Sequence, residues 1–315
     1  MNSQHRLQKI RIGWFIPLQR SRKDYDRVQA SVWIRCLSLI EQLRPLGYHS
    51  TINQPWAPMD IAIFLRVEGD WAQRLLRFLK WRGVKTVYTA VVNYYQRQGN
   101  ADKISHLVSD QQMHNCLSMT QAADAVITVS RYLKGMAETH NNDVFYLPDS
   151  VTRSHFHFTK ATDDFNRTKL KLIWSGQSTK AATIDTLHDV IQDLPVTLTI
   201  VSNAPPKLKT PFDFVPWHYQ TFPQEIVKGD ICISPRILDN SYDQGHSNFK
   251  IMVFLAQGMP VLASPQDSYL EVIKDGYNGF ICYTADDWRN HLQTLIENRA
   301  LLSDMSTNAV ASAER

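Results

Sequence analysis

One stretch in the last third of the chain, Gly229 to Ser264, constrains the fold most. Residues 230–235 are a short β-branched run that ends at a proline, and a polar segment follows. An apolar run then leads to Gly258, and a second β-branched run covers residues 260–264. This order predicts strand, loop, helix and strand, the βαβ unit of a parallel sheet.

Polar side chains gather where that loop meets the predicted helix. Ser247, Asn248 and Lys250 place a hydroxyl, an amide and an ammonium within four residues. The free backbone N–H groups and the positive end of the helix dipole favour an anion at the same place. The sequence therefore predicts a phosphate site at the start of this helix.

Five segments of the second half follow one another in a familiar order. They are GDICISP, SNFK, AQGMPVLAS, LEVIKDGYNGFICY and the polar-faced tail from Asp286 to Ala309. The series resembles the C-terminal nucleotide-sugar domain of GT-B glycosyltransferases, particularly the retaining group often called family 4. The resemblance covers most of residues 169–309 and, more thinly, residues 123–154. It implies two doubly wound, Rossmann-like α/β domains that face each other across a cleft.

Length and composition agree with two domains. The 315 residues are 43% hydrophobic and 10% aromatic, which is enough for two cores of ordinary size. We expect an acceptor-side domain over residues 1–160 and a nucleotide-sugar domain over residues 161–315. The four cysteines are far apart and form no CxxC pattern, so the sequence suggests neither a zinc site nor a disulfide framework.

The distribution of charge differs between the two halves. Residues 1–160 hold 21 Lys and Arg against 12 Asp and Glu, and residues 161–315 hold 13 against 18, so charges of +9 and −5 give the net +4. A basic first half indicates an anionic partner, with solvated surface charge as the alternative. No nucleic-acid docking motif accompanies it, so we expect no nucleic-acid partner.

The expected location is the cytoplasm. No apolar run is long enough to span a bilayer, and the first residues lack the apolar stretch of a signal peptide. The helix expected over about residues 70–82 puts apolar side chains on one side and a basic and aromatic set on or near another. The first set is Trp71, Leu75, Phe78 and Leu79, and the second is Arg74, Arg77, Trp81 and Lys85. Such a face can rest peripherally on an anionic membrane. The alternative is a sheet-covering helix with a charged outer face.

In the first half, candidate site residues follow the ends of predicted strands, where open α/β sheets bind ligands. After the strand at 11–17, the resemblance makes Arg20, Arg22, Lys23 and Arg27 candidates for an acidic acceptor group, with a solvated loop as the alternative.

Two further candidates in the first half follow later strands. After the strand at 84–92, Asn93 stands where many family members carry a histidine or an acidic pair, so it is a candidate catalytic residue that can hydrogen-bond a sugar. Ser130 ends the strand at 123–130 and is a further acceptor-side candidate, although capping of the next helix alone would explain it.

In the second half, a strand at 170–174 runs into Gly176 and then Lys180. Family members carry a glycine here and then a Lys or Arg that reaches the donor diphosphate. The segment matches neither GxxxxGK[ST] nor GxGxxG, which argues against a P-loop ATPase or a dinucleotide enzyme. By the resemblance Trp217, after a short strand near residues 214–215, borders the nucleobase, and a core position is the alternative.

Two glutamates typical of the family are missing. Alignment of AQGMPV places their positions at Gly245 and Val253. Loss of the ribose-binding carboxylate costs about 1.5–3 kcal/mol of donor binding. Glu271 is an alternative ribose contact.

The resulting hypothesis is a hexosyltransferase-type glycosyltransferase that moves a sugar from a nucleoside diphosphate to a glycan, a lipid-linked or a small-molecule acceptor. Lys180, Ser247, Asn248 and Lys250 would neutralise the departing diphosphate. No DxD motif is present, so we expect no metal and no cofactor besides the donor, and the resemblance implies retention of configuration. The alternative is a catalytically weakened relative that binds a nucleotide or glycan and supports a partner enzyme.

Overall fold

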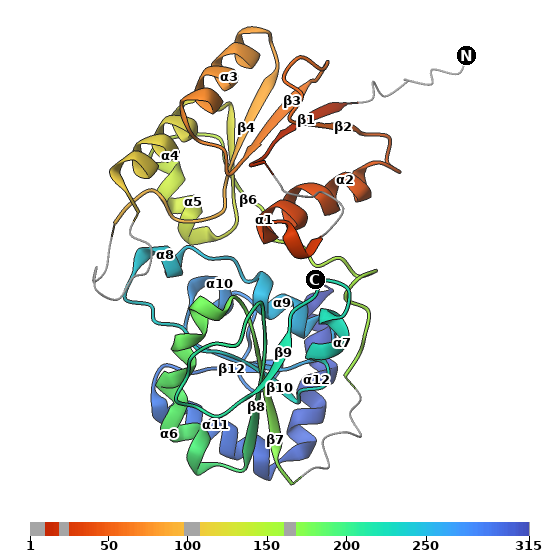
Figure 1. Cartoon of the computed structure of the whole chain (residues 1–315), viewed down its shortest axis with the longest axis vertical. Helices are drawn as coiled ribbons and strands as arrows, with labels where there is room; N and C mark the ends of the chain where they lie inside the picture. Colours follow the sequence, from red (N-terminus) through yellow and green to blue (C-terminus); the bar gives the residue numbers. More distant parts are fainter. Residues whose placement is uncertain (1–9, 19–24, 98–107, 161–167, 315) are drawn as a thin grey trace. The chain divides into compact units, whose positions relative to one another are not determined.

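The computed structural model describes residues 10–18, 25–97, 108–160 and 168–314. The chain forms two units, each built around its own six-stranded sheet (Figure 1). Every strand pair in both sheets is parallel. The prediction of two doubly wound α/β domains is confirmed.

Unit 1 comprises residues 1–149 and 239–246. Its strands are β1 (Arg11–Phe15), β2 (His49–Ile52), β3 (Ile61–Leu65), β4 (Lys85–Ala90), β5 (Ala125–Thr128) and β6 (Val144–Tyr146). Its helical segments are η1 (Tyr25–Arg27), α1 (Ala30–Val32), the π-helical η2 (Trp33–Leu37), α2 (Ser38–Leu43), α3 (Asp70–Trp81), α4 (Asp110–Ala122), α5 (Arg131–Glu138) and α8 (Ser241–Gln244).

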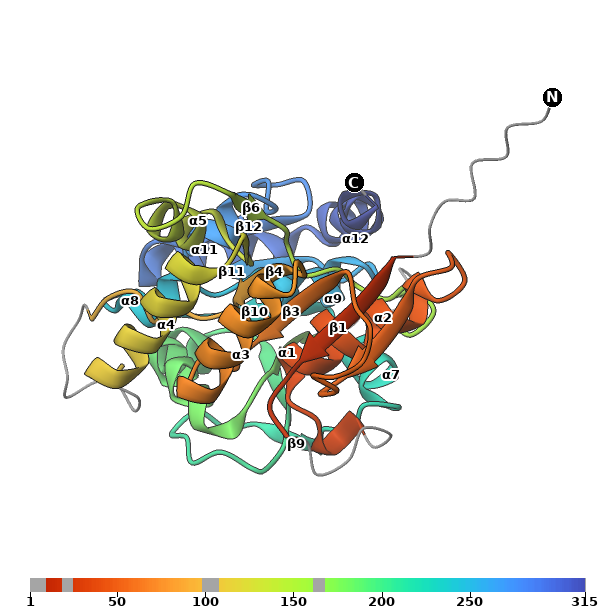
Figure 2. The same ribbon diagram turned by 90° about the horizontal axis from the view of Figure 1, so that it is seen from above.

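The sheet of unit 1 has the order β2-β1-β3-β4-β5-β6. The chain leaves β1 toward β2 on one side and then builds β3 to β6 on the other, so the order reverses between β1 and β3. Helices α3 and α4 lie side by side on one face of the sheet (Figure 1 and Figure 2). The α3 helix buries Ala72, Leu75, Leu76 and Leu79, which recur at the spacing of one helix face.

Unit 2 comprises residues 150–238 and 247–315. Its strands are β7 (Leu170–Ser175), β8 (Val196–Ser202), β9 (Asp213–Pro216), β10 (Ile231–Ser234), β11 (Val261–Ala263) and β12 (Gly279–Ile281). Its helical segments are the 3₁₀ stretch η5 (Ser178–Leu187), α6 (His188–Asp193), α7 (Phe222–Ile226), α9 (Phe249–Leu255), α10 (Asp267–Leu270), α11 (Ala285–Glu297) and α12 (Arg299–Ala313).

The sheet of unit 2 has the order β12-β11-β10-β7-β8-β9. It grows from β7 to β9 on one side and from β10 to β12 on the other, so its order reverses between β7 and β10. The predicted βαβ unit is therefore present as β10, α9 and β11, with β10 and β11 directly paired. Buried Leu172, Trp174, Ile233 and Leu262 belong to the core on this sheet.

Packing assigns two segments differently from the expected domains. Residues 150–160, expected at the end of the first domain, pack with unit 2, where buried Lys160 Nζ lies 3.1 Å from Asp230 Oδ1. Residues 239–246, expected in the second domain, pack with unit 1, where Asn93 Nδ2 donates to the Ser241 carbonyl at 3.1 Å. Side chains distant in sequence therefore decide where each segment belongs.

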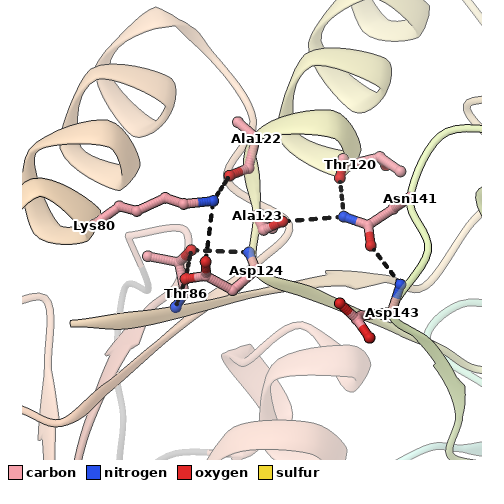
Figure 3. Close-up of polar contacts among 8 residues, drawn as sticks. All are labelled: Lys80, Thr86, Thr120, Ala122, Ala123, Asp124, Asn141 and Asp143. Atoms are coloured by element: carbon pink, nitrogen blue, oxygen red, sulfur yellow. Dashed lines mark hydrogen bonds and ion pairs between the residues drawn. The ribbon is translucent and has the colours of Figure 1, made fainter. Parts of the chain in front are cut away.

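The amino-terminal edge of the unit 1 sheet is held by a polar cluster (Figure 3). Lys80, in the last turn of α3, donates to the Ala122 carbonyl and pairs with Asp124, both at 3.0 Å. The same carboxylate accepts from Thr86 on β4, through its backbone N–H and its hydroxyl. These bonds fix the end of α3 to β4 and to the start of β5.

Candidate functional site

The carboxyl ends of β7 and β10 are the natural ligand position in unit 2. The strand order reverses between these two neighbours, so the loops that follow them lead away in opposite directions. Open α/β sheets bind ligands at such switch points. Gly176 and Lys180 follow β7, while Arg236 and Lys250 follow β10.

A stacked pair of side chains lies at this edge. The Lys250 ammonium is 4.4 Å from the ring centroid of Trp174, the buried penultimate residue of β7. A Cβ on Gly176 would stand 2.8 Å from the same indole. Glycine at 176 therefore leaves room for the ring on which Lys250 rests.

Three cations approach one another here. Burial, with Arg236 and Lys180 close by, holds the pKa of Lys250 well below its ordinary value. Mutual repulsion of this kind costs free energy that a bound anion relieves. The arrangement thus favours a multiply charged anion such as a diphosphate.

Arg236 is anchored by side chains from the neighbouring strand and helix. Its backbone N–H donates to Ser264 Oγ at 2.9 Å, and its guanidinium donates to the hydroxyl of buried Tyr269 at 3.2 Å. The Tyr269 hydroxyl also lies 3.2 Å from Ser234 Oγ at the end of β10. These bonds hold the guanidinium at the carboxyl edge.

Ser247 and Asn248 immediately precede α9, as predicted. The Ser247 hydroxyl accepts from the N–H of Phe249 at 3.4 Å. Asn248 is buried and makes no side-chain cap bond, and its Oδ1 has no hydrogen-bond partner among the described residues. Because α9 has only seven residues, the side-chain cations rather than the helix end supply most of the positive charge.

The predicted nucleoside contacts are more dispersed. Trp217 follows β9 at the edge of the sheet, partly buried, with its ring 6.0 Å from that of Phe222. Glu271 is exposed at the end of α10. Val253 is buried on α9, so the helix face aligned with the family's ribose-binding glutamate belongs to the core.

The catalytic candidate Asn93 and the acceptor-side candidate Ser130, both in unit 1, form hydrogen bonds within that unit. Fully buried Asn93 donates to the Ser241 carbonyl and accepts from the N–H of Tyr95. Fully buried Ser130 caps α5 by accepting from the N–H of Leu133, and its hydroxyl donates to the Gly245 carbonyl at 3.0 Å. Both side chains thereby hold the segment around α8.

Gly245 is also explained by this packing. A Cβ there would approach Asn93 Cβ to 3.0 Å and a methyl of Leu133 to 3.1 Å. Of the basic candidates after β1, Arg27 is exposed in η1. Arg20, Arg22 and Lys23 lie outside the described residues.

Similarity to known proteins lies in the structure and not in the sequence. No family model matches the sequence, and no curated protein is similar to it in sequence. Sucrose-phosphate synthase from Thermosynechococcus elongatus aligns with a TM-score of 0.72 at 13% identity, over 97% of this chain and 94% of that one. The chain has the GT-B fold. The fold expected from the resemblance is therefore confirmed.

Two further solved structures also align with nearly the whole chain. Anabaena HepE, solved in complex with UDP and glucose, aligns with a TM-score of 0.64 at 13% identity, over 97% of this chain and 95% of that one. WaaG, a glycosyltransferase involved in lipopolysaccharide biosynthesis, aligns with a TM-score of 0.61 at 11% identity, over 97% and 95%. At these identities the likeness establishes the fold alone.

Two residues of this site, Trp174 and Arg236, were not predicted from the sequence. Neither belongs to a motif of its own. The signal available is positional, because one is the penultimate residue of β7 and the other follows β10 by two residues. The sequence predicts both strands, but it does not predict that they are neighbours.

Proposed function

We propose that this protein is a glycosyltransferase that uses a nucleoside diphosphate sugar and holds its diphosphate between Lys180, Arg236 and Lys250. Lys250, stacked 4.4 Å from the ring centroid of Trp174 at the switch point of unit 2 and close enough to Arg236 and Lys180 for both to lower its pKa, carries the proposal. A glycosyltransferase fold and an anion site at the expected sheet edge support the same chemistry.

The cations assist departure of the nucleotide. As the bond from the anomeric carbon to the diphosphate oxygen breaks, negative charge grows on the departing group. Fixed positive groups stabilise that charge more than they stabilise the ground state. Lys250, stacked on Trp174, takes up a proton as the anion binds and is then fully cationic. Ser247 and Asn248 add neutral polar groups beside it.

The hexosyl donor, retention of configuration and independence of metal ions are finer parts of this proposal. The resemblance to the retaining group supports the first two. The absence of a DxD motif from the sequence supports the third. Glu271 is proposed as the ribose contact because Val253 offers no acceptor.

A weakened relative that only binds nucleotide is the second candidate. The buried valine on α9 favours it, since no carboxylate stands at the aligned ribose position. The cationic cluster favours the enzyme. Turnover of any nucleotide sugar by the purified chain decides for the enzyme.

A cytoplasmic location with peripheral membrane contact also belongs to the proposal. Within the described part of the chain, no helix combines the length and apolarity that a bilayer crossing requires. A lipid-linked acceptor would be reached from the membrane surface.

The first test is the thermal stability of the purified protein with UDP, GDP, ADP, TDP or CMP. A ligand that binds the folded state at about a hundredfold excess over its Kd stabilises it by about 2.7 kcal/mol. We expect one diphosphate to raise the melting temperature and Lys250→Met to remove most of that rise. No rise with any nucleotide, together with no turnover, would reject the proposed function.

A further inference from the structure

An aromatic and cationic surface runs along α3 of unit 1. Trp81 is 82% exposed and Trp56, from the segment between β2 and β3, is 77% exposed. Both stand against the ring of Phe78, at 6.1 and 5.7 Å between centroids. Trp71, at the start of the same helix, is 54% exposed.

Exposure of this kind is costly in water. Large aromatic side chains rarely gather on a surface without a partner, and indoles are enriched where one end of a ring meets hydrocarbon and the other meets water. Three indoles and one phenyl ring on and beside a single twelve-residue helix therefore indicate a surface that is normally covered.

The same surface carries arginines. Arg82 lies 5.6 Å from the centroid of Phe78, and Arg74 and Arg77 lie on the outer side of α3. Among the described residues, none of these three arginines forms an ion pair with a carboxylate. Arg74 and Arg77, with Asp70 and Gln73, line a shallow hollow.

The acidic groups nearby are mostly neutralised by other partners. Asp60 pairs with Arg11 at 2.6 Å, and Asp124 pairs with Lys80 at 3.0 Å (Figure 3). Asp70 is the acidic side chain of α3 itself, at its first turn. The surface is thus positive as well as aromatic.

We propose that this α3 surface, defined by Trp56, Trp71, Phe78, Trp81 and the three arginines, seats the protein on a bilayer that contains anionic phospholipids. The indoles enter the interface between head groups and acyl chains, while the arginine heads reach lipid phosphates. Each such cation adds about 1 kcal/mol, or about fivefold in partitioning, near an anionic surface.

The buried side of α3 fixes the helix independently of its exposed side chains. Ala72, Leu75, Leu76 and Leu79 fasten the opposite side of α3 into the core, and the Lys80 cluster holds its last turn. Exposed side chains can therefore be exchanged without loss of packing, which makes the surface testable.

The experiment is co-sedimentation of the full chain with vesicles of phosphatidylcholine, with and without about 30% phosphatidylglycerol. We expect binding to the anionic vesicles that weakens with salt, and a blue shift of tryptophan fluorescence. Trp56→Ser with Trp81→Ser should lower the partition coefficient by about tenfold or more. Arg77→Glu with Arg82→Glu should lower it by about 25-fold or more, from two losses of about fivefold.

Matched controls lie in unit 2. Tyr283→Ser removes another exposed aromatic ring and Lys207→Glu reverses another exposed cation, and both should leave vesicle binding unchanged. Three results would overturn the proposal: no binding to anionic vesicles, equal binding to neutral vesicles, or equal binding by the α3 variants. So would a dimer in solution that the tryptophan variants dissociate, because a second copy would then cover the surface.

This inference rests on the proposed function for its membrane contact, to which it assigns a surface, and its test does not require transferase activity. Failure of vesicle binding would leave nucleotide binding intact, whereas failure of nucleotide binding would leave the membrane surface intact. The thermal shift and the sedimentation assay therefore report the two independently.

Discussion

Among single residues, Lys250 gives the most direct test of the proposed diphosphate site. Its ammonium rests on the Trp174 ring and shares its surroundings with Arg236 and Lys180. A cation placed beside two others and partly withdrawn from water loses its proton more easily than a lysine in solution. Binding an anion offsets both effects, because its negative charge favours the protonated form of the lysine.

Nucleoside diphosphate binding should therefore be coupled to proton uptake. The window lies between the lowered pKa of Lys250 in the free protein and the ordinary lysine value of about 10.4. Calorimetry at pH about 9 in buffers with different ionisation enthalpies measures the uptake. We expect a fraction of one proton, which disappears in Lys250→Met.

Lys250→Met should also weaken binding by about 10- to 100-fold, the value of about 1.5–3 kcal/mol for a charge-assisted hydrogen bond. The control is Lys207→Met, which removes an exposed lysine of the same unit. Binding enthalpies that are the same in all buffers would contradict the coupling of nucleotide binding to proton uptake.

Glu68 is an acidic group whose pKa is raised in the folded protein, whereas the pKa of Lys250 is lowered. Burial raises the pKa of its carboxyl, although Tyr88 donates to it at 2.6 Å and Arg66 lies nearby. Since the folded state binds this proton more tightly than the unfolded state, the stability of the fold falls as pH rises from the unfolded value of about 4.3 through the folded pKa.

Glu68→Gln should consequently be more stable than the unchanged protein at pH 7, with a difference that shrinks as the pH is lowered. Urea denaturation at several pH values measures it. Glu297→Gln, an exposed glutamate on α11, should show no such trend. A destabilised Glu68→Gln protein at pH 7 would show that the carboxylate is held by its partners despite its burial.

At the scale of helices and strands, the surroundings of Gly135 and Gly176 predict different effects of replacing each glycine. Gly135 lies exposed inside α5, and beyond its own helix no heavy atom lies within 4 Å of the position that a Cβ would take. This glycine therefore destabilises the helix relative to alanine and has no packing role there. Gly176 follows β7 beside the indole of Trp174, where a Cβ would stand 2.8 Å from the ring.

The two alanine variants should therefore have opposite effects on the free energy of unfolding. Gly135→Ala should raise it by about 0.5–1 kcal/mol, since alanine loses less backbone freedom in a helix. Gly176→Ala should lower it by about 1–3 kcal/mol and weaken nucleotide binding, because the indole under Lys250 must move. Denaturation curves of both variants measure the contrast, and a Gly176→Ala protein with unchanged binding would separate the ring from the anion site.

At the scale of the whole molecule, the chain passes from unit 2 into unit 1 and back again between β10 and α9. Residues 239–246 pack with unit 1 although β10 and α9, on either side, belong to unit 2. Asn93 and Ser130 hold this segment through its backbone carbonyls. The loop that follows β10, beside the cations of unit 2, therefore continues directly into unit 1.

Hydrogen exchange on the full chain should locate the donor. We expect a binding nucleoside diphosphate to slow exchange at residues 175–180, 235–238 and 247–250 of unit 2, which follow β7 and β10 or begin α9. Helix α4 of unit 1, which carries none of the proposed donor contacts, serves as the internal reference. Protection confined to unit 1 would place the nucleotide elsewhere and contradict the proposed site.

Local patterns in the sequence predict most of the long strands and helices and the α/β class of fold. Mainly apolar runs in β7, β10 and β11 predict buried parallel strands, and the hydrophobic spacing in α3 predicts one apolar helix face. Such patterns can be interpreted from neighbouring residues alone. Ser247, Asn248 and Lys250 likewise stand out by their spacing before an apolar helix.

Which of those pieces lie together depends on packing between distant segments. Trp174 and Arg236 join Lys250 because β7 pairs with β10, although the two strands are far apart in the sequence. The same long-range packing turns Asn93 and Ser130 toward a backbone segment and leaves Trp56 beside Phe78 on the surface. Contacts of this kind depend on the whole folded chain, which no local pattern encodes.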